Sequence, residues 1–359
     1  MEVRSVREAD VKGKRVLVRA DFNVPLKGGA VVNDVRIKAV VPTLEFLHTA
    51  GASQIILLIH LGRPGGKVVE DLRVAPVEAR LRELTKAPFE LRENLRFDQR
   101  EEASDEGFAK ELAGLGDIFV NDAFADLHRP HTSIVGIPKF LPSYAGLLVE
   151  REVEMLTKAL TPPAGALAIL GGAKFETKIP LITELLKHYP RVLLGGALGN
   201  DVIKARGLNT GSSIVSTTPV PVELATEERL LVPVDAVVRD ANLNAERTAL
   251  IHDLRAVEGV VDLGPATTTL WQEEVKSASF VLWNGPLGIY EDGYKRGTEA
   301  VAETLVKANV PAMVGGGDTT AAIAHFSFDP AKVFLSTGGG AMLEFLAKGT
   351  LVGLEPLKK

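Results

Sequence analysis

The chain has 359 residues, of which 46% are hydrophobic, and its formal net charge at pH 7 is −5. A chain of this length exceeds what one hydrophobic core usually organises, so we expect two domains; the acidic balance argues against general binding to nucleic acid or to an anionic membrane. The absence of cysteine excludes disulfides, thiol catalysis and cysteine-ligated metal sites. No apolar run approaches a membrane span, and residues 1–10 lack the apolar part of a secretion signal, so we expect a cytoplasmic protein.

Apolar strands and amphipathic helices alternate along almost the whole chain. Continuous apolar runs predict strands at Arg15–Arg19, Gln54–Ile59, Ile118–Val120, Ala166–Leu170, Val192–Leu194, Phe280–Trp283 and Ala312–Val314. Helical periodicity is found in Arg36–His48, Val77–Leu84, Lys178–His188, Ala266–Lys276 and Gly297–Ala308. Strands that are apolar throughout are buried on both faces, which is typical of parallel sheets covered by helices. The pattern predicts an α/β protein of two doubly wound (Rossmann-like) three-layer domains with parallel sheets, joined by an interdomain helix and hinge.

A charged helix followed by two prolines marks the expected boundary between the domains. The stretch Leu147–Leu160 has helical periodicity, and Thr161-Pro162-Pro163 should end the helix because proline cannot continue it. We predict an N-terminal domain at residues 1–146, an interdomain helix and hinge at residues 147–163, a C-terminal domain at residues 164–345, and a C-terminal segment at residues 346–359 that returns to the first domain.

Arginines and histidines recur where the predicted strands of the first half end. Ligands of open parallel sheets gather outside the carboxyl ends of the strands. The residues found there, or at the start of the first helix, are Asp21, Asn23, Arg36, His60, Arg63, Arg96 and Arg129. A single arginine is more often part of a surface ion pair, but this recurrence favours a clamp for phosphate and carboxylate oxygens. Arg19 lies inside its strand, so we expect it to pair with a neighbouring carboxylate.

Glycine loops take the corresponding place in the second half. The runs Gly315-Gly316-Gly317-Asp318-Thr319 and Gly338-Gly339-Gly340 each follow an apolar strand, and Gly171-Gly172-Ala173-Lys174 follows another. Glycine lets successive backbone N–H groups approach an anion closely, and Asp318 could hold Mg²⁺. The triplets by themselves are about equally consistent with tight strand-to-helix turns that bind nothing. Neither the Walker A spacing nor a G-x-G-x-x-G after a strand is present.

Seven segments resemble the signature segments of phosphoglycerate kinase. In order they are Arg19-Ala20-Asp21-Phe22-Asn23-Val24-Pro25, His60-Leu61-Gly62-Arg63-Pro64, Glu93-Asn94-Leu95-Arg96-Phe97, Gly171-Gly172-Ala173-Lys174, Trp283-Asn284-Gly285-Pro286, Gly315-Gly316-Gly317-Asp318-Thr319 and Ser336-Thr337-Gly338-Gly339-Gly340. They follow the family order and cover essentially the whole chain. The resemblance implies a reversible, Mg²⁺-dependent phosphoryl transfer from 1,3-bisphosphoglycerate to ADP, which gives 3-phosphoglycerate and ATP. It places the acid substrate on the N-terminal domain and the Mg-nucleotide on the C-terminal domain.

The resemblance also implies a role for each residue that matches a family motif. The acid substrate would be bound by Asp21, Asn23, Arg36, His60, Arg63, Arg96 and Arg129. The nucleotide would be bound by Gly172, Lys174, Lys178, Gly195, Gly264, Asn284, Pro286, Glu291, Gly316, Gly317, Asp318 and Thr319, with the magnesium on Asp318. The groups that act on the transferred phosphoryl would be Arg36, Lys174, Gly317 and Gly339.

The mechanism implied by the resemblance is direct in-line transfer after hinge closure. The attacking ADP oxygen is already ionised, so catalysis needs no general base and depends on positioning and charge neutralisation. The family expectation is a monomer that has small-molecule partners and neither a nucleic-acid nor a membrane partner.

One departure from the family affects the expected nucleotide pocket. Ala197-Leu198-Gly199-Asn200-Asp201 stands where the family commonly carries an aromatic-rich stretch, so the preference between adenine and guanine nucleotides is not predicted.

Two other functions are compatible with a two-domain α/β chain. A nicotinamide-dependent dehydrogenase is disfavoured by the missing dinucleotide fingerprint. A non-catalytic nucleotide sensor would be expected to lack Arg36, Lys174 or Asp318, and all of these residues are present.

Overall fold

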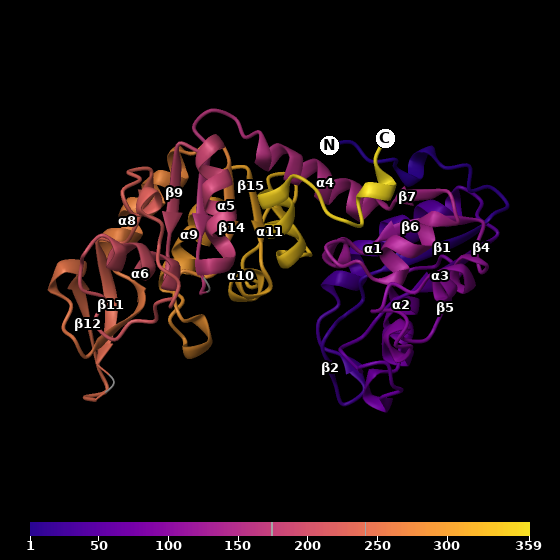
Figure 1. Ribbon diagram of the computed structural model, residues 1–359, viewed down its shortest axis with the longest axis horizontal. Helices are drawn as coiled ribbons and strands as arrows, with labels where there is room; N and C mark the ends of the chain where they lie inside the picture. The colour runs from indigo at the N-terminus through magenta and orange to yellow at the C-terminus, as the bar shows by residue number, and fades with distance from the viewer. Residues whose placement is uncertain (174, 241) are drawn as a thin grey trace. The chain divides into compact units, whose positions relative to one another are not determined.

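A computed structural model describes residues 1–173, 175–240 and 242–359 of the chain, which divides into two compact units (Figure 1). Unit 1 comprises Met1–Thr157 together with Thr350–Lys359, and unit 2 comprises Lys158–Gly349. In the described ranges, no helix combines the length and the apolar character needed to cross a bilayer. Lys174, which was expected to bind the nucleotide, lies outside the described residues.

A parallel sheet of five strands forms the centre of unit 1. The strands stand in the order β5-β4-β1-β6-β7 and are β1 (Arg15–Ala20), β4 (Gln54–Leu58), β5 (Glu90–Leu91), β6 (Ile118–Asp122) and β7 (Ser143–Ala145). A small antiparallel hairpin is formed by β2 (Leu26–Lys27) and β3 (Ala30–Val31). All pairs in the main sheet are parallel, so the carboxyl ends of its strands lie along one edge.

Helices cover both faces of this sheet because its central strand is buried on both faces. The helices of unit 1 are α1 (Val35–Thr49), α2 (Ala75–Leu84), α3 (Glu106–Ala113) and the first part of α4 (Leu147–Leu160). Val16 and Val18 pack with buried side chains of α1 and α2, whereas Leu17 packs with buried side chains of α3. Alternate residues of a strand point to opposite faces, so Arg19 lies on the same face as Leu17.

Short helical turns connect these elements, and some of them lie at the carboxyl edge of the sheet. They are η1 (Val6–Glu8), η2 (Glu70–Leu72), η3 (Leu95–Phe97), η4 (Phe124–Asp126), η5 (Thr132–Gly136, a π-turn) and η6 (Ile137–Lys139). The turns η3 and η4 bring Arg96 and Asp126 to this edge, which is where the sequence predicted a ligand site.

A buried carboxylate fixes the start of α4 to the end of β6. Asp122 accepts hydrogen bonds from Thr43 Oγ1 at 2.6 Å, from Leu148 N at 3.0 Å and from Val149 N at 3.1 Å. Burial raises the pKa of Asp122 to about 7, and these donors oppose the rise. The helix ends at Leu160, immediately before the Thr-Pro-Pro sequence, as predicted.

A second parallel sheet, of six strands, forms the centre of unit 2. Its order is β10-β9-β8-β14-β15-β16, with β8 (Leu167–Leu170), β9 (Arg191–Leu194), β10 (Leu230–Leu231), β14 (Val281–Asn284), β15 (Ala312–Gly315) and β16 (Val333–Leu335). The helices are α5 (Phe175–His188), α6 (Gly196–Ala205), α7 (Val222–Ala225), α8 (Pro265–Ser277), α9 (Arg296–Ala308), α10 (Gly317–Ala322) and α11 (Gly339–Lys348), with short turns η7 (Ile251–Asp253) and η8 (Tyr290–Asp292). The helices α8 and α9 pack on the sheet through Trp271, Val275, Val301 and Leu305. The predicted parallel α/β architecture is confirmed.

Unit 2 also contains a small antiparallel sheet that the sequence did not predict. It consists of β11 (Asp235–Asp240), β12 (Ala245–Leu250) and β13 (Glu258–Leu263) in the order β12-β11-β13. Val238 of β11 packs with Ile203 of α6, but most of β12 is exposed. Because these strands are only partly buried, they lack the continuous apolar run by which the other strands were found.

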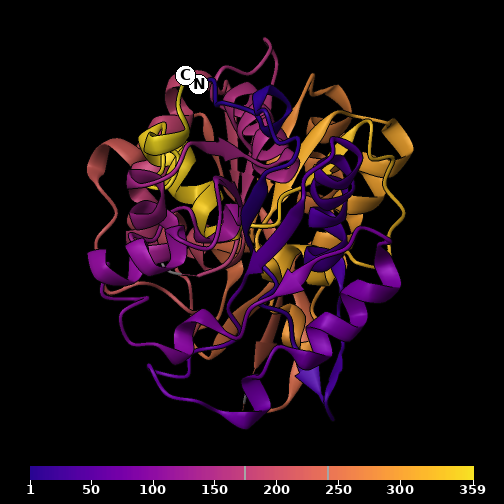
Figure 2. The same cartoon turned by 90° about the vertical axis from the view of Figure 1, so that its right-hand side faces the viewer.

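The last ten residues lie on unit 1. Helix α11 ends at a left-handed residue, Gly349, whose φ of 75° directs the chain away from the helix axis. The segment then bonds to unit 1 through Gly353 N to Leu127 O at 2.8 Å and Arg4 N to Leu357 O at 2.7 Å, and it ends in the turn η9 (Glu355–Leu357). The two chain termini consequently lie side by side (Figure 2), joined by a bridge between Val3 and Lys358.

Candidate active site

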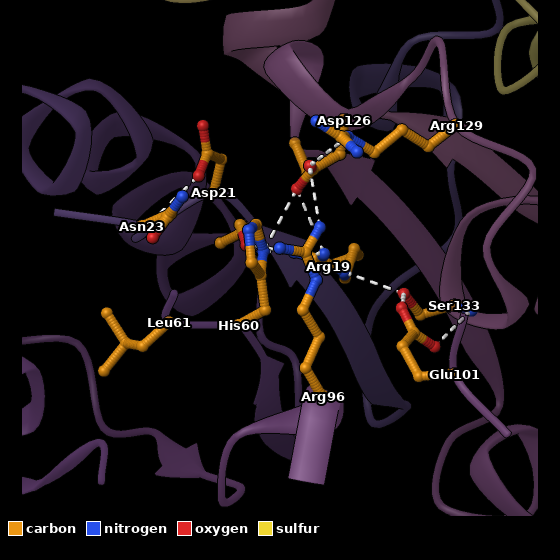
Figure 3. Close-up of polar contacts among 12 residues, drawn as sticks. Arg19, Asp21, Asn23, His60, Leu61, Arg96, Glu101, Asp126, Arg129 and Ser133 are labelled. Atoms are coloured by element: carbon orange, nitrogen blue, oxygen red, sulfur yellow. Dashed lines mark hydrogen bonds and ion pairs between the residues drawn. The ribbon is translucent and has the colours of Figure 1, made fainter. Parts of the chain in front are cut away.

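A buried carboxylate, Asp126, stands at the centre of a cluster of cations in unit 1 (Figure 3). Its Oδ2 lies 3.1 Å from Arg19 Nη2 and 3.2 Å from His60 Nδ1. Its Oδ1 lies 3.7 Å from Arg129 Nε and 4.0 Å from Arg96 Nη2. Burial by itself raises the pKa of Asp126, but the surrounding cations outweigh it and lower this pKa to about 2, so the carboxylate is ionised.

Arg19 is fully buried, and each of its nitrogens has a partner. Its Nε donates to Ser133 Oγ at 2.8 Å, its Nη1 donates to Ala20 O at 2.5 Å, and its Nη2 reaches Asp126. Ser133 is held in turn by Glu101, which accepts from Ser133 Oγ at 2.6 Å and from Ser133 N at 3.0 Å. The prediction that Arg19 pairs with a carboxylate is confirmed, and the partner is Asp126.

His60 follows β4 and is 2% exposed. Its Nδ1 lies 3.1 Å from Arg19 Nη2. Burial lowers the pKa of His60 to about 3 with the help of the neighbouring arginines, although the charge of Asp126 opposes this shift, so the ring is neutral near pH 7.

Asp21, Asn23 and Arg36 form a second group beside this cluster. Arg36 Nη1 lies 2.8 Å from Asp21 Oδ2, and Asp21 Oδ1 accepts from Asn23 N at 3.0 Å. The side chain of Asn23 accepts from Gly62 N at 2.9 Å, which connects the loops after β1 and β4. Burial, together with the charge of Asp126, raises the pKa of Asp21 to about 6.

Arg96 and Arg129 carry buried donors without hydrogen-bond partners among the described residues. Arg96 Nη1 donates to Gly62 O at 2.8 Å, but its Nε and Nη2 make no hydrogen bond. Arg96 Nε forms an ion pair with Glu102 Oε1 at 3.3 Å that lacks hydrogen-bond geometry. Arg129 Nε forms a similar ion pair with Asp126 Oδ1, also without hydrogen-bond geometry. Buried donors left without an acceptor are costly, so this arrangement fits a site completed by an anionic ligand.

A cavity of about 290 Å³ in unit 2 is bounded by the loops after β8, β9, β14 and β15. Its walls include the apolar side chains Ile214, Val260, Val261, Leu287 and Ile289. Its polar side chains are Asn200, Glu291 and Asp318. A largely apolar cavity with a few polar groups is the usual form of a small-molecule site.

Lys178 and Asn284 meet below the floor of this cavity. Lys178 Nζ donates to Gly171 O at 2.8 Å and to Asn284 Oδ1 at 3.2 Å. Burial lowers the pKa of Lys178 to about 8, and the charge of Asp318 partly opposes this. Asn284 Nδ2 is buried without a hydrogen-bond partner among the described residues.

The two glycine triplets form strand-to-helix turns that pack against each other. The first follows β15 and precedes α10, with Gly316 at a φ of 102°, and the second precedes α11. A Cβ built on Gly339 would lie 2.8 Å from Gly316 Cα, so a side chain there would collide with the facing backbone. The first-turn N–H groups of both helices have no partner within their helix, which leaves them able to bind an anion.

Comparison with known proteins identifies the family. The sequence model of the phosphoglycerate kinase family matches residues 6–92 and 89–349. The chain is 41% identical to the phosphoglycerate kinase of Pelotomaculum thermopropionicum, over 99% of each chain, and 41% identical to that of a Roseiflexus species with the same coverage. The chain belongs to the phosphoglycerate kinase family. A member of this family is a phosphotransferase, as the sequence predicted.

Solved structures of phosphoglycerate kinases have the same fold. The enzyme from Coxiella burnetii superposes with a TM-score of 0.87 at 33% identity, and both chains are covered to 99%. The enzyme from Pyrococcus horikoshii gives a TM-score of 0.81 at 26% identity, with 99% of this chain and 98% of the other covered. These matches extend the family resemblance from sequence segments to the arrangement of nearly the whole chain.

The structure brings most of the residues expected to bind the phosphoglycerate together, but Arg63 stands apart. Asp21, Asn23, Arg36 and Arg96 are connected to one another through direct contacts or through Gly62. His60 and Arg129 both reach Asp126. Arg63 is exposed, and no ion pair to it is found within the described part of the chain.

Of the residues expected to bind the nucleotide, some line the cavity in unit 2 and others do not. Gly172, Pro286, Glu291 and Asp318 line the cavity. Gly195 and Gly264 do not line it themselves, although Gly195 packs against the lining residue Leu287, and a Cβ on Gly264 would collide with the carboxylate of Asp235. The Thr319 hydroxyl is buried and accepts from Gly285 N at 2.7 Å, so its side chain stabilises a neighbouring turn.

Sequence reasoning missed Asp126, Asn200 and Tyr290. Asp126 could have been found, because it lies near the end of a predicted strand beside residues that were chosen. Asn200 lines the cavity with 4% of its surface exposed, and Tyr290 Oη donates to Asp318 Oδ1 at 3.3 Å. Asn200 lies on α6 and Tyr290 begins the turn η8, and neither residue carries a local sequence signal for a ligand site.

Proposed function

We propose that this chain catalyses reversible phosphoryl transfer between 1,3-bisphosphoglycerate and ADP, a step of glycolysis that is reversed in gluconeogenesis. Unit 1 holds the phosphoglycerate and unit 2 holds the nucleotide. The observation that carries this division is the set of buried guanidinium donors of Arg96 and Arg129 that have no hydrogen-bond partner among the residues that the structure describes. Such donors call for phosphate or carboxylate oxygens, and 3-phosphoglycerate has both.

In unit 1, cations and hydrogen-bonding groups surround the acid substrate. The binding residues are Asp21, Asn23, Arg36, His60, Arg63, Arg96 and Arg129. Arg36 is the member of this set that also acts on the transferred group, since its side chain is 35% exposed and its guanidinium can turn from Asp21 towards a ligand.

In unit 2, the apolar walls of the cavity receive the nucleobase, and Glu291 bonds to the ribose hydroxyls. The phosphates are held by Lys178 and by backbone N–H groups of the glycine loops. This surface is shaped by Gly172, Gly195, Gly264, Asn284, Pro286, Gly316 and Thr319. Lys174 belongs to the same set but lies outside the described residues. The mutual packing of the two glycine loops supports a joint role for Gly317 and Gly339 at the transferred phosphoryl.

Asp318 fits the magnesium that the reaction requires. Its exposed carboxylate borders the cavity, and its Oδ1 accepts a hydrogen bond from the hydroxyl of Tyr290. Magnesium is usually held by one or two carboxylates together with substrate phosphates, which is the donor set offered here. Bound there with the nucleotide, the ion would neutralise charge on the phosphates.

The transfer is in line and direct, and it needs no general base because the attacking oxygen of ADP is already ionised. The residues of this chain orient the two substrates and neutralise charge on the moving group. The acyl phosphate is prone to hydrolysis, so closure at the hinge of residues 147–163 excludes water during transfer. We further propose that the protein is a cytoplasmic monomer.

A coupled assay with ATP and 3-phosphoglycerate, run with and without Mg²⁺, tests this function. We expect turnover with Mg²⁺ that disappears when the metal is chelated. Binding of both ligands without turnover would instead identify a nucleotide sensor. Oxidation or reduction of a nicotinamide cofactor by the protein would identify a dehydrogenase.

A further inference from the structure

We propose that Asp126 is a positioning residue of the phosphoglycerate site, which holds Arg19, Arg96 and Arg129 ready for the substrate without contacting it. The inference rests on the proposed function of unit 1. It adds a residue that none of the sequence motifs of the family resemblance contains.

The first argument is that one carboxylate forms ion pairs with three guanidiniums. Asp126 is 4% exposed, and its Oδ2 accepts a hydrogen bond from Arg19 Nη2 at 3.1 Å. Its Oδ1 lies 4.0 Å from Arg96 Nη2 and 3.7 Å from Arg129 Nε, which is beyond hydrogen-bond range. Asp126 therefore offsets the repulsion among the arginines and leaves the donors of Arg96 and Arg129 available to a ligand.

The second argument is the tautomer of His60. The contact between Arg19 Nη2 and His60 Nδ1 at 3.1 Å has hydrogen-bond geometry, whereas His60 Nδ1 and Asp126 Oδ2 are 3.2 Å apart without hydrogen-bond geometry. A guanidinium can donate but cannot accept, so Nδ1 of the neutral ring accepts this bond and Nε2 carries the proton. Asp126 fixes Arg19, and through it keeps His60 as a donor that suits an anionic substrate (Figure 3).

A divalent cation is a poor alternative ligand for this place. The side chains of Asp21, His60 and Asp126 offer oxygen and nitrogen atoms within 4.8 Å of one another, which could in principle surround a metal ion. However, Arg19 already bonds to both His60 and Asp126, and Arg36 bonds to Asp21. A metal ion would have to displace these guanidiniums and stand among like charges, so the cluster suits an anion.

A second alternative is that Asp126 only competes with the substrate for the arginines. The two roles predict opposite effects of Asp126→Asn, which keeps the shape of the side chain and removes its charge. If Asp126 only competes, the variant gains a positive site charge and should bind 3-phosphoglycerate more tightly. If Asp126 positions the arginines, binding should weaken even though the net charge favours it.

The experiment is a calorimetric titration of the full-length Asp126→Asn protein with 3-phosphoglycerate and, separately, with ADP. We expect the affinity for 3-phosphoglycerate to fall by roughly 10-fold or more, as is typical when a charged hydrogen bond is lost, and the affinity for ADP to stay unchanged. The matched control is Asp122→Asn, a buried carboxylate of the same unit that contacts none of these cations. The control should bind both ligands as the unaltered protein does.

A second readout separates positioning from a merely structural role. Nitrogen NMR of the His60 ring should show Nε2–H in the unaltered protein and a mixture of tautomers in Asp126→Asn. Unaltered or tighter binding of 3-phosphoglycerate by Asp126→Asn, or an unchanged tautomer, would overturn the proposal.

If Asp126→Asn does not fold, the double variant Arg19→Gln with Asp126→Asn replaces the buried ion pair by two neutral amides. It should fold and bind 3-phosphoglycerate weakly, and binding at the original affinity would overturn the proposal. Failure of the unaltered protein to bind 3-phosphoglycerate would refute the proposed function of unit 1 itself, so the two failures are distinguishable.

Discussion

The candidate sites of the two units are built from different kinds of chemical group. In unit 1 the site consists of charged side chains, with three arginines gathered around the single carboxylate of Asp126. In unit 2 the site consists largely of backbone, with glycine loops in direct contact and one buried lysine, Lys178. Under the proposed function, these are two physical solutions to the binding of anions within one chain.

The two solutions have different requirements. Buried guanidiniums repel one another and need a counter-ion and fixed hydrogen bonds, and Asp126, Ser133 and Glu101 supply these in unit 1. Backbone N–H groups carry no net charge and need only close approach, which a Cβ would prevent at Gly339. Unit 1 should consequently be sensitive to loss of a charge, and unit 2 to gain of a methyl group.

The largest effect is expected from Arg36→Ala in unit 1. Removal of a donor that stabilises the transition state should lower turnover by roughly 10²- to 10³-fold. The steady-state kcat in the coupled assay measures this. Arg82→Ala, which removes an exposed ion pair with Glu78 on the same unit, is the control and should keep normal turnover. Normal turnover in Arg36→Ala would remove this residue from the catalytic set.

A smaller effect, confined to unit 2, is expected from Asp318→Ala. Loss of the magnesium ligand should weaken ADP binding in the presence of Mg²⁺ by roughly 10- to 100-fold, as for other charged contacts, and leave 3-phosphoglycerate binding nearly intact. Calorimetry with each ligand separately measures both affinities. Equal loss of the two affinities would contradict the assignment of one ligand to each unit.

Gly339→Ala tests the backbone solution directly. The added methyl group would stand 2.8 Å from Gly316 Cα, so the two loops must separate. Overpacking of this kind costs about 1–3 kcal/mol, and we expect ADP binding to weaken by roughly 10-fold. Ala347→Ser, on the same helix and remote from the loop, is the control. Unchanged ADP binding in Gly339→Ala would show that close packing of the loops is not needed.

The smallest effect concerns stability and pH in unit 1. The pKa of Asp122 is raised by burial to about 7, above its unfolded value, so the folded chain keeps a proton that the unfolded chain releases. This contribution to stability is present at low pH and is lost as the pH rises towards 7. Asp122→Asn does not titrate, so the free energy of unfolding of this variant, relative to that of the unaltered protein, should increase by about 1 kcal/mol between pH 6 and pH 8. Urea unfolding at both pH values measures the difference, and a pH-independent difference would contradict the raised pKa.

The sequence predicted the long, fully buried elements well. The helix that ends at Leu160 and the strand that leads into Gly315 were found, because burial on both faces and proline both leave local signals. The antiparallel sheet of β11, β12 and β13 was not found, because its strands carry charged residues and lack a continuous apolar run. The residues of the proposed phosphoglycerate site were predicted as a set of strand-end residues, but the carboxylate of Asp126, which lies among them, was not.

The sequence by itself determined the family, the alternation of strands and helices, and the glycine and arginine positions at the strand ends. These features are local, since they depend on neighbouring residues and on the period of apolar positions. Only the tertiary structure decided which side chains meet. Arg19 contacts Asp126 and Ser133, which stand 107 and 114 positions further along the chain, because parallel strands bring their ends to one edge. A contact over such a separation leaves no trace in the local pattern, so the central role of Asp126 emerged only from the fold.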